Sequence, residues 1–148
     1  HDKEKSKQIM ISLKPISQYI KDLSFENFAA QKNNFEDEKL DLHIDLNIKK
    51  KSIGNNLIEI TIIPLLEAKN SNEKKFIIEL SYASTFILNP VKNGIELKKF
   101  AFIDCPTLMF PFLRQIIYNV TRDGGFKPVN LEFIDFSTLF YKKHSSVI

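Results

Sequence analysis

The most constraining feature of this sequence is a strict alternation of apolar and polar residues between positions 40 and 48. The even positions carry Leu40, Leu42, Ile44, Leu46 and Ile48, and the odd positions carry Asp41, His43, Asp45 and Asn47. Because successive side chains of a strand point to opposite faces, this pattern predicts a β-strand with one dry and one wet face. A chain with such a strand needs a sheet that is covered on one side only.

Three further segments have strand-like patterns. We expect strands over residues 16–26, 57–69 and 76–88, separated by turns at 53–56 and 70–73 that are rich in Gly, Asn and Ser. Pro64 cannot donate a ladder hydrogen bond, so it predicts an edge position or a bulge in its strand. Four sequential strands with short turns indicate an antiparallel sheet.

Helical spacing appears only after the strands. Apolar residues recur at helical spacing over 111–123, with Pro111 at the expected first position and Gly124 and Gly125 as a stop. Asp135 is a candidate N-cap for a short last helix that ends at Tyr141 or Lys143. We interpret residues 89–105 as a long crossover loop. The predicted fold class is α+β: a four-stranded antiparallel sheet, the crossover loop, one long helix and a short C-terminal helix.

The length of 148 residues fits a single domain. We place this domain at 16–143, with a flexible N-terminal segment over 1–15 and a short tail over 144–148. No apolar run reaches the roughly 20 residues that a membrane helix needs, so we expect no membrane insertion and a cytoplasmic location.

Motifs and charge argue against nucleic-acid binding and catalysis. The net charge is +3, but the lysines cluster at the termini and predicted turns, without a groove-reading motif. Cys105 is the one cysteine, and with three histidines it shows no metal-ligand spacing. A lone cysteine is most often a small core residue. We therefore expect no enzyme activity, no cofactor and no metal.

The aromatic content is unusual, with 13 Phe, 4 Tyr and no Trp. Phenylalanine offers a large apolar area without a polar group, so it suits a core or a surface that grips hydrophobic chains. One small core does not easily hide this many rings. We expect some of them, in the crossover loop and around the last helix, to line an exposed apolar groove.

Several segments resemble the SecB family, in family order and over roughly residues 16–141. The most specific is CPTLMFPFLRQ at 105–115, followed by TRDGGF at 121–126 and IDF at 134–136. YIKDLSFEN at 19–27, LDLHI at 40–44 and FIIELSY at 76–82 resemble strands of that family. The chain departs from the family's typical acidity, from the acidic tail of many relatives, from Gly-Ile at Ser84 and Thr85, and from Pro at Phe28.

The resemblance implies a chaperone that holds unfolded precursor proteins without ATP and passes them to the SecA motor ATPase. It implies a homotetramer, a dimer of dimers. A client-binding groove is expected to include Phe86, Phe100, Phe102, Phe126, Phe136 and Phe140. A docking face for the basic, zinc-containing tail of SecA is expected at Asp22, Glu26, Ile77 and Glu79. With Asp41, Asp45 and Glu59 at further polar positions, we expect this sheet face to be acidic.

A second hypothesis stays open. The chain could be a SecB-like binding module dedicated to one unstable partner, such as an antitoxin, without a general export role. A retained acidic docking face favours the export role, and its absence would favour the dedicated module.

Overall fold

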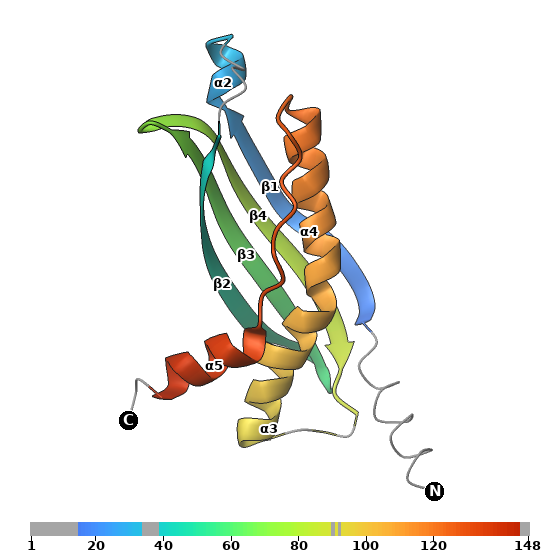
Figure 1. Ribbon diagram of the computed structural model, residues 1–148. Coiled ribbons are helices and arrows are strands. Elements are labelled where there is room, and N and C mark those ends of the chain that lie inside the picture. The colour runs from blue at the N-terminus through green and yellow to red at the C-terminus, as the bar shows by residue number, and fades with distance from the viewer. Residues whose placement is uncertain (1–14, 34–38, 90, 92, 146–148) are drawn as a thin grey trace, which may run out of the picture.

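The protein is a single antiparallel sheet with a long helix along one face. The computed structural model describes residues 15–33, 39–89, 91 and 93–145. Its strands are β1 (Pro15–Asn27), β2 (Asp41–Gly54), β3 (Leu57–Asn70) and β4 (Glu73–Ile87). They lie in the order β1-β4-β3-β2, so β1 and β2 form the two edges (Figure 1). The predicted four-stranded antiparallel sheet is confirmed.

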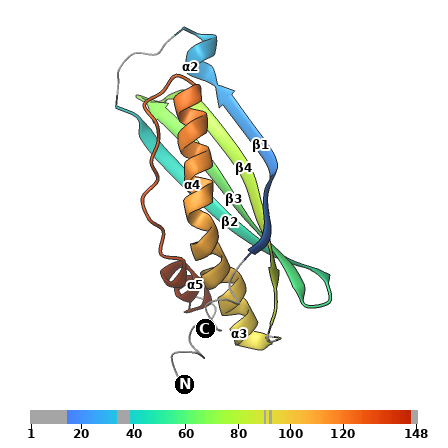
Figure 2. The same cartoon turned by 90° about the vertical axis from the view of Figure 1, so that its right-hand side faces the viewer.

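The helices follow the sheet, apart from the short α2 (Phe28–Gln31) at the end of β1. The helix α3 (Gly94–Lys99), a π-helical turn (Phe100–Asp104) and α4 (Cys105–Asp123) form one continuous helix. The short α5 (Phe136–Ser145) projects past the end of β2, and the connection between α4 and α5 runs back beside α4 (Figures 1 and 2). The predicted long helix and the predicted short C-terminal helix are both confirmed.

The predicted crossover loop is much shorter than the sequence indicated. Helix begins at Gly94, so most of the segment 89–105 is helical and Pro111 lies inside α4 rather than at its start. The π-helical turn ends at Asp104, two residues before Pro106, whose nitrogen cannot donate an α-helical bond. A π-turn adds one residue to a helical turn and shifts the apolar spacing, which hides the continuity of this helix in the sequence.

Pro64 lies in a central strand, not at an edge. β3 pairs with both β2 and β4, yet Ile63 and Pro64 pair only with β2, at Asn47 and Leu46. The pairing with β4 resumes at Leu65 in unchanged register, so no bulge occurs there. A gap in the β3–β4 ladder thus accommodates the missing N–H of Pro64.

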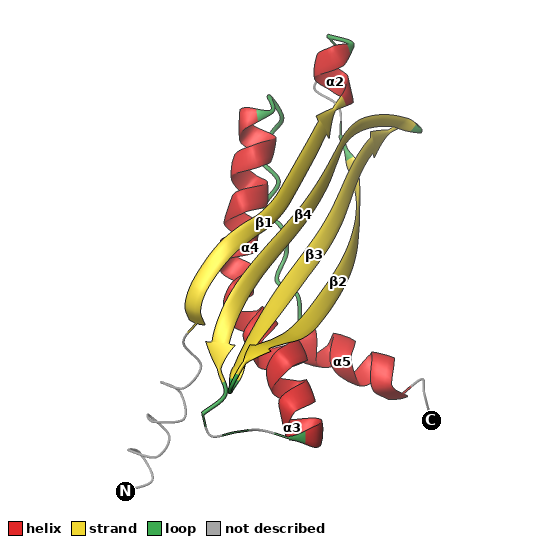
Figure 3. Cartoon of the chain, turned by 180° about the vertical axis from the view of Figure 1, so that it is seen from behind, coloured by secondary structure: helices red, strands yellow, loops and turns green. Residues whose placement is uncertain are grey.

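The core lies between the sheet and α4. The even-numbered side chains of β3 and β4 face α4. On the side of α4 that faces the sheet, buried side chains recur every four residues. The strand side chains include Ile58, Ile60, Ile62, Leu66, Phe76, Ile78, Leu80 and Phe86, and the helix row is Cys105, Met109, Leu113 and Ile117. No helix of the described residues covers the centre of the other face of the sheet (Figure 3). We call this face the open face.

The end of α4 is fixed by glycine and by a buried threonine. Gly125 has a φ of 92°, a conformation that glycine adopts without strain, as expected for the predicted stop. Thr121 Oγ1 donates to the Ile117 carbonyl at 2.9 Å and accepts from the Val129 amide at 2.9 Å. This hydroxyl therefore ties the returning connection to α4.

We expected no segment long and apolar enough to span a membrane, and the structure corrects this point for one helix. The continuous helix from Gly94 to Asp123 is 30 residues long, and by length and composition alone it could cross a membrane. Its buried residues pack on the sheet, as in the core helix of a two-layer protein.

Of the predicted terminal segments, residues 1–14 and 146–148 lie outside the described residues, and residues 144 and 145 continue α5.

Candidate functional site

An apolar groove of about 670 Å³ lies where α5 passes the edge strand β2. Six apolar side chains line it: Leu46 and Ile48 of β2, Phe102 of the π-helical turn, and Phe136, Leu139 and Phe140 of α5. The groove is within the size range of protein binding pockets, and mostly apolar walls are typical of them. It can receive bulky hydrophobic side chains.

Local interactions hold α5 as the outer wall of this groove. Asp135 caps the helix, as predicted, because its carboxylate accepts from the backbone amides of Ser137 (3.1 Å) and Thr138 (3.3 Å). Hydrogen bonds from these two residues, first from the Ser137 side chain, lower the pKa of Asp135. The rings of Phe110 and Phe136 meet edge to face at 6.0 Å, which anchors α5 on α4.

The structure separates the six predicted groove phenylalanines into two sets. Phe102, Phe136 and Phe140 line the groove. Phe86 and Phe100 are 0% and 2% exposed and pack edge to face in the core, with ring centroids 5.9 Å apart. Phe126 lies at the other end of α4, 4.8 Å from the ring of Phe76. We therefore leave Phe86, Phe100 and Phe126 out of the groove defined here.

Sequence reasoning missed the β2 wall and the rim of the groove. Leu46 and Ile48 were predicted as inward-facing strand residues, but their role depends on β2 being an edge strand that extends past α4. Leu139 is an exposed residue at helical spacing from Phe136. Lys98, Lys142 and Lys143 also line the groove. Their spacing along the chain gave no signal that α3 and α5 would meet.

The four predicted docking residues lie together on the open face. Glu26 pairs directly with Ile77, and Ser24, between Asp22 and Glu26, pairs with Glu79. Residues opposite and diagonal to each other on neighbouring strands have side chains within reach. Asp22, Glu26 and Glu79 are exposed and Ile77 is half-buried. Within the part of the chain that the structure describes, none of these three carboxylates has an ion-pair partner.

A shallow apolar hollow of about 360 Å³ adjoins this acidic cluster. Ile63 and Leu65 of β3 line it with Glu79 and Asp45. Leu65 pairs directly with Glu79 across β3 and β4, and it is 36% exposed. The open face thus combines carboxylates with apolar contacts, a combination that suits a basic and partly apolar partner.

The acidity predicted for the open face is confined to one end of it. At the other end, β2 carries Lys49 and Lys51, and Lys51 lies opposite Glu59 of β3 in the strand pairing. Glu59 is neutralised locally, because it accepts from Tyr19 at 2.5 Å and from Lys21 at 2.9 Å. These hydrogen bonds, first that from Tyr19, lower the pKa of Glu59. Asp22, Glu26 and Glu79, in contrast, remain available to a partner, and Asp41 and Asp45 of β2 are exposed at the same end.

Catalytic chemistry has no support in the described part of the chain. Cys105 is 1% exposed, and burial, followed by the charge of Asp104, raises the pKa of its thiol well above the usual range. Such a thiol stays protonated and unreactive. No group of three or more His, Cys, Asp or Glu side chains among the described residues is arranged to hold a metal ion.

The fold and the two surfaces are typical of one class of protein: a binding protein with an apolar groove on one side of a sheet and exposed carboxylates on the other. The family model for the preprotein translocase subunit SecB matches residues 3–146. The chain belongs to the SecB family, whose members are protein-export chaperones and not enzymes.

Similarities to individual proteins agree with this assignment. The chain is 36% identical over 140 residues to the protein-export protein SecB of Dinoroseobacter shibae, covering 93% of this chain and 81% of the relative. It is 38% identical over 133 residues to that of Ruegeria pomeroyi, covering 88% and 80%. A SecB-like chaperone of Mycobacterium tuberculosis, solved in complex with a peptide from an antitoxin, has the same fold. Its TM-score is 0.72 at 12% identity, covering 86% of this chain and 95% of that one.

Proposed function

We propose that this protein holds newly made precursor proteins unfolded in the cytoplasm, without ATP, and delivers them to the SecA motor. The observation that carries the proposal is the separation of two surfaces in a SecB-family chain. The apolar groove opens beside β2 on the helix side of the sheet, and the carboxylates of Asp22, Glu26 and Glu79 lie on the open face. A client and a motor domain can therefore be bound together.

Client holding follows from the groove. Bulky side chains of a non-native chain enter between Leu46, Ile48 and the rings of α5, where each buried apolar side chain contributes roughly 1.5–3 kcal/mol before the costs of binding. β2 is an edge strand, so its outer backbone groups can add hydrogen bonds to an extended client. Binding to the unfolded state alone then opposes folding by mass action.

We further propose that the protein is a homotetramer. α4 leaves Leu108 and Phe112 exposed, at 37% and 49%, on its side away from the core. β1 is an edge strand whose Ile20 and Leu23 are 48% and 39% exposed. Apolar surface of this kind and an unpaired strand edge both favour association of copies. Four copies would also bring four weak client sites together, which raises affinity by avidity.

The proposed function is tested by two measurements on the same preparation. In an aggregation assay without ATP, the protein should keep a chemically unfolded precursor soluble when present at about one tetramer per client. Calorimetry should show binding of the zinc-loaded tail of SecA, weakening as salt rises. Light scattering should give four times the chain mass of 17.2 kDa. A stable monomer at micromolar concentration, or a precursor that aggregates unhindered, would contradict the proposal.

The export role has more support than the dedicated module. Relatives at 36% and 38% identity carry the protein-export name. The likeness to the antitoxin-bound chaperone is one of fold, at 12% identity. Co-purification from cytosol discriminates the two: several precursors together with the motor support export, and one recurrent partner without the motor supports the dedicated module.

A further inference from the structure

β1 contains a bulge near its middle. Ile20 pairs with Tyr82 of β4, and Asp22 pairs with Ser81, so β1 has one residue more than β4 at this point, namely Lys21. The strand curves toward its N-terminal end (Figure 3), as bulged strands do. The bulge lies directly before the first carboxylate of the docking face.

This extra residue decides which face of the sheet the carboxylates of β1 occupy. Without it, Asp22 would lie opposite Leu80 on the side of the sheet that faces the core. Glu26 would lie opposite Phe76, on that same side. A shift of one residue turns every side chain of a strand to the other face. The bulge therefore puts both carboxylates on the open face, beside Glu79.

Two side chains of the bulged segment bind one carboxylate on the open face. The Tyr19 hydroxyl donates to Glu59 at 2.5 Å, and Lys21 Nζ donates to the other oxygen of the same carboxylate at 2.9 Å. The Tyr19 hydroxyl also lies 3.2 Å from Thr85 Oγ1 of β4. Glu59 belongs to β3, so both side chains reach past the neighbouring strand to bind it. These contacts hold the bulge against the sheet.

A separate anchor holds the far end of β1, where Glu26 lies. On one side of Glu26, the ring of Phe25 packs on Phe76 with centroids 5.9 Å apart. On its other side, Asn27 donates to the carbonyl at the end of α4. Asp22 follows the bulge directly and lies farther from this anchor. The contacts that hold the bulge should therefore affect Asp22 more than Glu26.

We propose that Tyr19, Lys21 and Glu59 are positioning residues for the docking face. Their contacts fix the bulge and thereby hold Asp22 beside Glu79, where both carboxylates can meet one basic partner. This inference rests on the proposed function, since it concerns the surface proposed for the SecA tail. Without these contacts, the bulged segment moves and Asp22 no longer has one fixed position.

Tyr19→Phe with Lys21→Met tests the proposal, because positioning and net charge predict opposite results. The double variant loses one positive charge, so long-range attraction alone would strengthen the binding of a basic tail. Loss of positioning should instead weaken binding roughly 3- to 5-fold, as when one exposed charge pair no longer forms. Calorimetry with the zinc-loaded SecA tail measures the affinity, and the aggregation assay checks that client holding is intact.

Lys49→Met is the matched control. Lys49 is exposed on the open face of β2, and its replacement removes the same charge without touching β1. This variant should bind the tail as tightly as wild type, or slightly more tightly. If it weakens binding as much as the double variant does, the bulge is not the cause and the inference is overturned.

Double-mutant cycles show which carboxylate the positioning acts through. In an Asp22→Asn background, the changes at Tyr19 and Lys21 should have little further effect on tail affinity, because the charge that they position is already gone. In a Glu26→Gln background, the same changes should keep their full effect. A general loss of structure would weaken binding equally in both backgrounds, so equal effects overturn the inference.

The outcomes separate this inference from the proposed function. If the wild-type protein does not bind the tail, the docking face is wrong and the inference fails with it. Wild-type binding that the double variant keeps or strengthens overturns the positioning role alone. If the double variant unfolds, Tyr19→Phe decides, since it removes one hydroxyl and no charge. A loss of roughly 2-fold or more in its tail affinity then supports the proposal, and wild-type affinity overturns it.

Discussion

The side-chain amide of Asn27, the last residue of β1, donates a hydrogen bond of 2.8 Å to the carbonyl oxygen of Gly124, which follows α4. The carbonyl groups at a helix C-terminus have no partner within the helix, so this bond satisfies one of them. Asn27 Oδ1 also accepts from the Ala30 amide at 2.9 Å and caps α2. One side chain thus joins an edge of the sheet, α2 and the end of the long helix.

Gly124→Ala should destabilise the protein by about 1–3 kcal/mol, the usual range for overpacking. A Cβ at Gly124 would lie 2.5 Å from Phe25 Cζ, so the ring or the helix end must move and the Asn27 bond is strained. Gly54→Ala is the matched control, because its Cβ would meet Leu57 Cδ1 at 3.5 Å, an ordinary contact. Urea unfolding of both variants measures the difference. Equal losses would mean that close approach at Gly124 is not the cause.

Phe140→Ser should weaken the suppression of client aggregation while the oligomer stays intact. Phe140 is 5% exposed and lines the groove, so its loss removes apolar contact area for the client. The stability cost should stay near or below about 3 kcal/mol, because α5 lies outside the layer between the sheet and α4. The aggregation assay and light scattering on the same sample check this.

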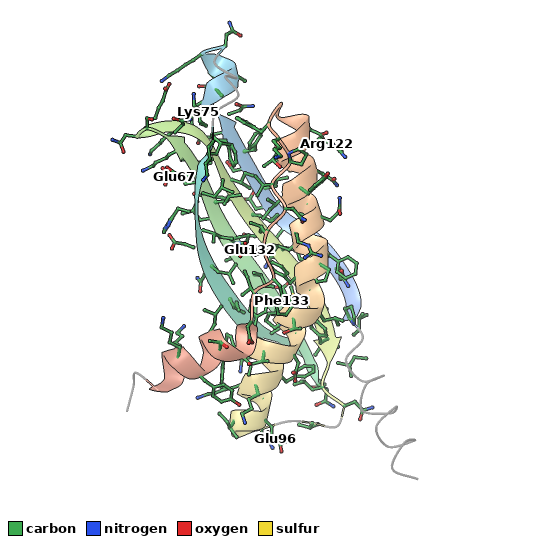
Figure 4. The ribbon with its side chains drawn as sticks, in the orientation of Figure 1. Glu67, Lys75, Glu96, Arg122, Glu132 and Phe133 are labelled. Carbon is green, nitrogen blue, oxygen red and sulfur yellow. The ribbon has the colours of Figure 1, made fainter. Side chains whose placement is uncertain are left out.

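Phe133→Ser is the control for that change. Phe133 is 70% exposed on the connection after α4 and does not line the groove (Figure 4). It should leave client holding unchanged. If Phe140→Ser unfolds the protein instead, Phe140 is a core residue and its place in the groove is wrong. Equal loss of holding in both variants would point to general surface apolarity.

The sequence predicted the strands better than the groove, for a physical reason. Alternation at residues 40–48 predicts which side chains lie on the apolar face of the strand, but not which element packs against them. Leu46 lines a groove and Ile62 a core because β2 is an edge strand and β3 a central one, and strand order leaves no local pattern. The proposed docking residues were easier to predict: alternation alone put Asp22 and Glu26 on one face, and pairing with β4 then brought Glu79 beside them.

Glu59→Gln should flatten the loss of stability in acid. The folded protein has a lowered pKa at Glu59, so the stabilisation from Tyr19 and Lys21 is present above the unfolded value and is lost as pH falls through the folded value. The difference in unfolding free energy between wild type and variant should therefore be largest near neutral pH and shrink below about pH 4.5. Urea unfolding between about pH 7 and pH 3 measures it.

The same pair predicts an alkaline effect. The hydrogen bond with Glu59 raises the pKa of Lys21, so this contribution is present below the unfolded pKa of lysine and is lost as pH rises through the raised value. Glu132→Gln makes the same change in charge on an exposed side chain of the connection (Figure 4). The role given to Glu59 is wrong if the difference in unfolding free energy between wild type and Glu59→Gln does not shrink in acid. It is also wrong if Glu132→Gln shows the same difference.

Asp22→Lys with Glu79→Lys should abolish binding to the SecA tail and leave client holding intact. Asp22 and Glu79 flank Ser24 on the open face, so a basic partner would meet two lysines where it now meets two carboxylates. Like charges placed opposite each other cost several kcal/mol at an interface, so the tail affinity should fall by more than about 100-fold. The groove opens on the helix side of the sheet and should not respond.

The control for this double change is Asp123→Lys with Glu132→Lys, two exposed carboxylates outside the sheet. It alters net charge equally and should retain most of the tail affinity, with a modest loss at low salt from the weaker long-range attraction. Calorimetry with the zinc-loaded tail, repeated at two salt concentrations, distinguishes the variants. Unchanged tail affinity after Asp22→Lys with Glu79→Lys would remove the docking assignment, and the dedicated-module hypothesis would then move ahead.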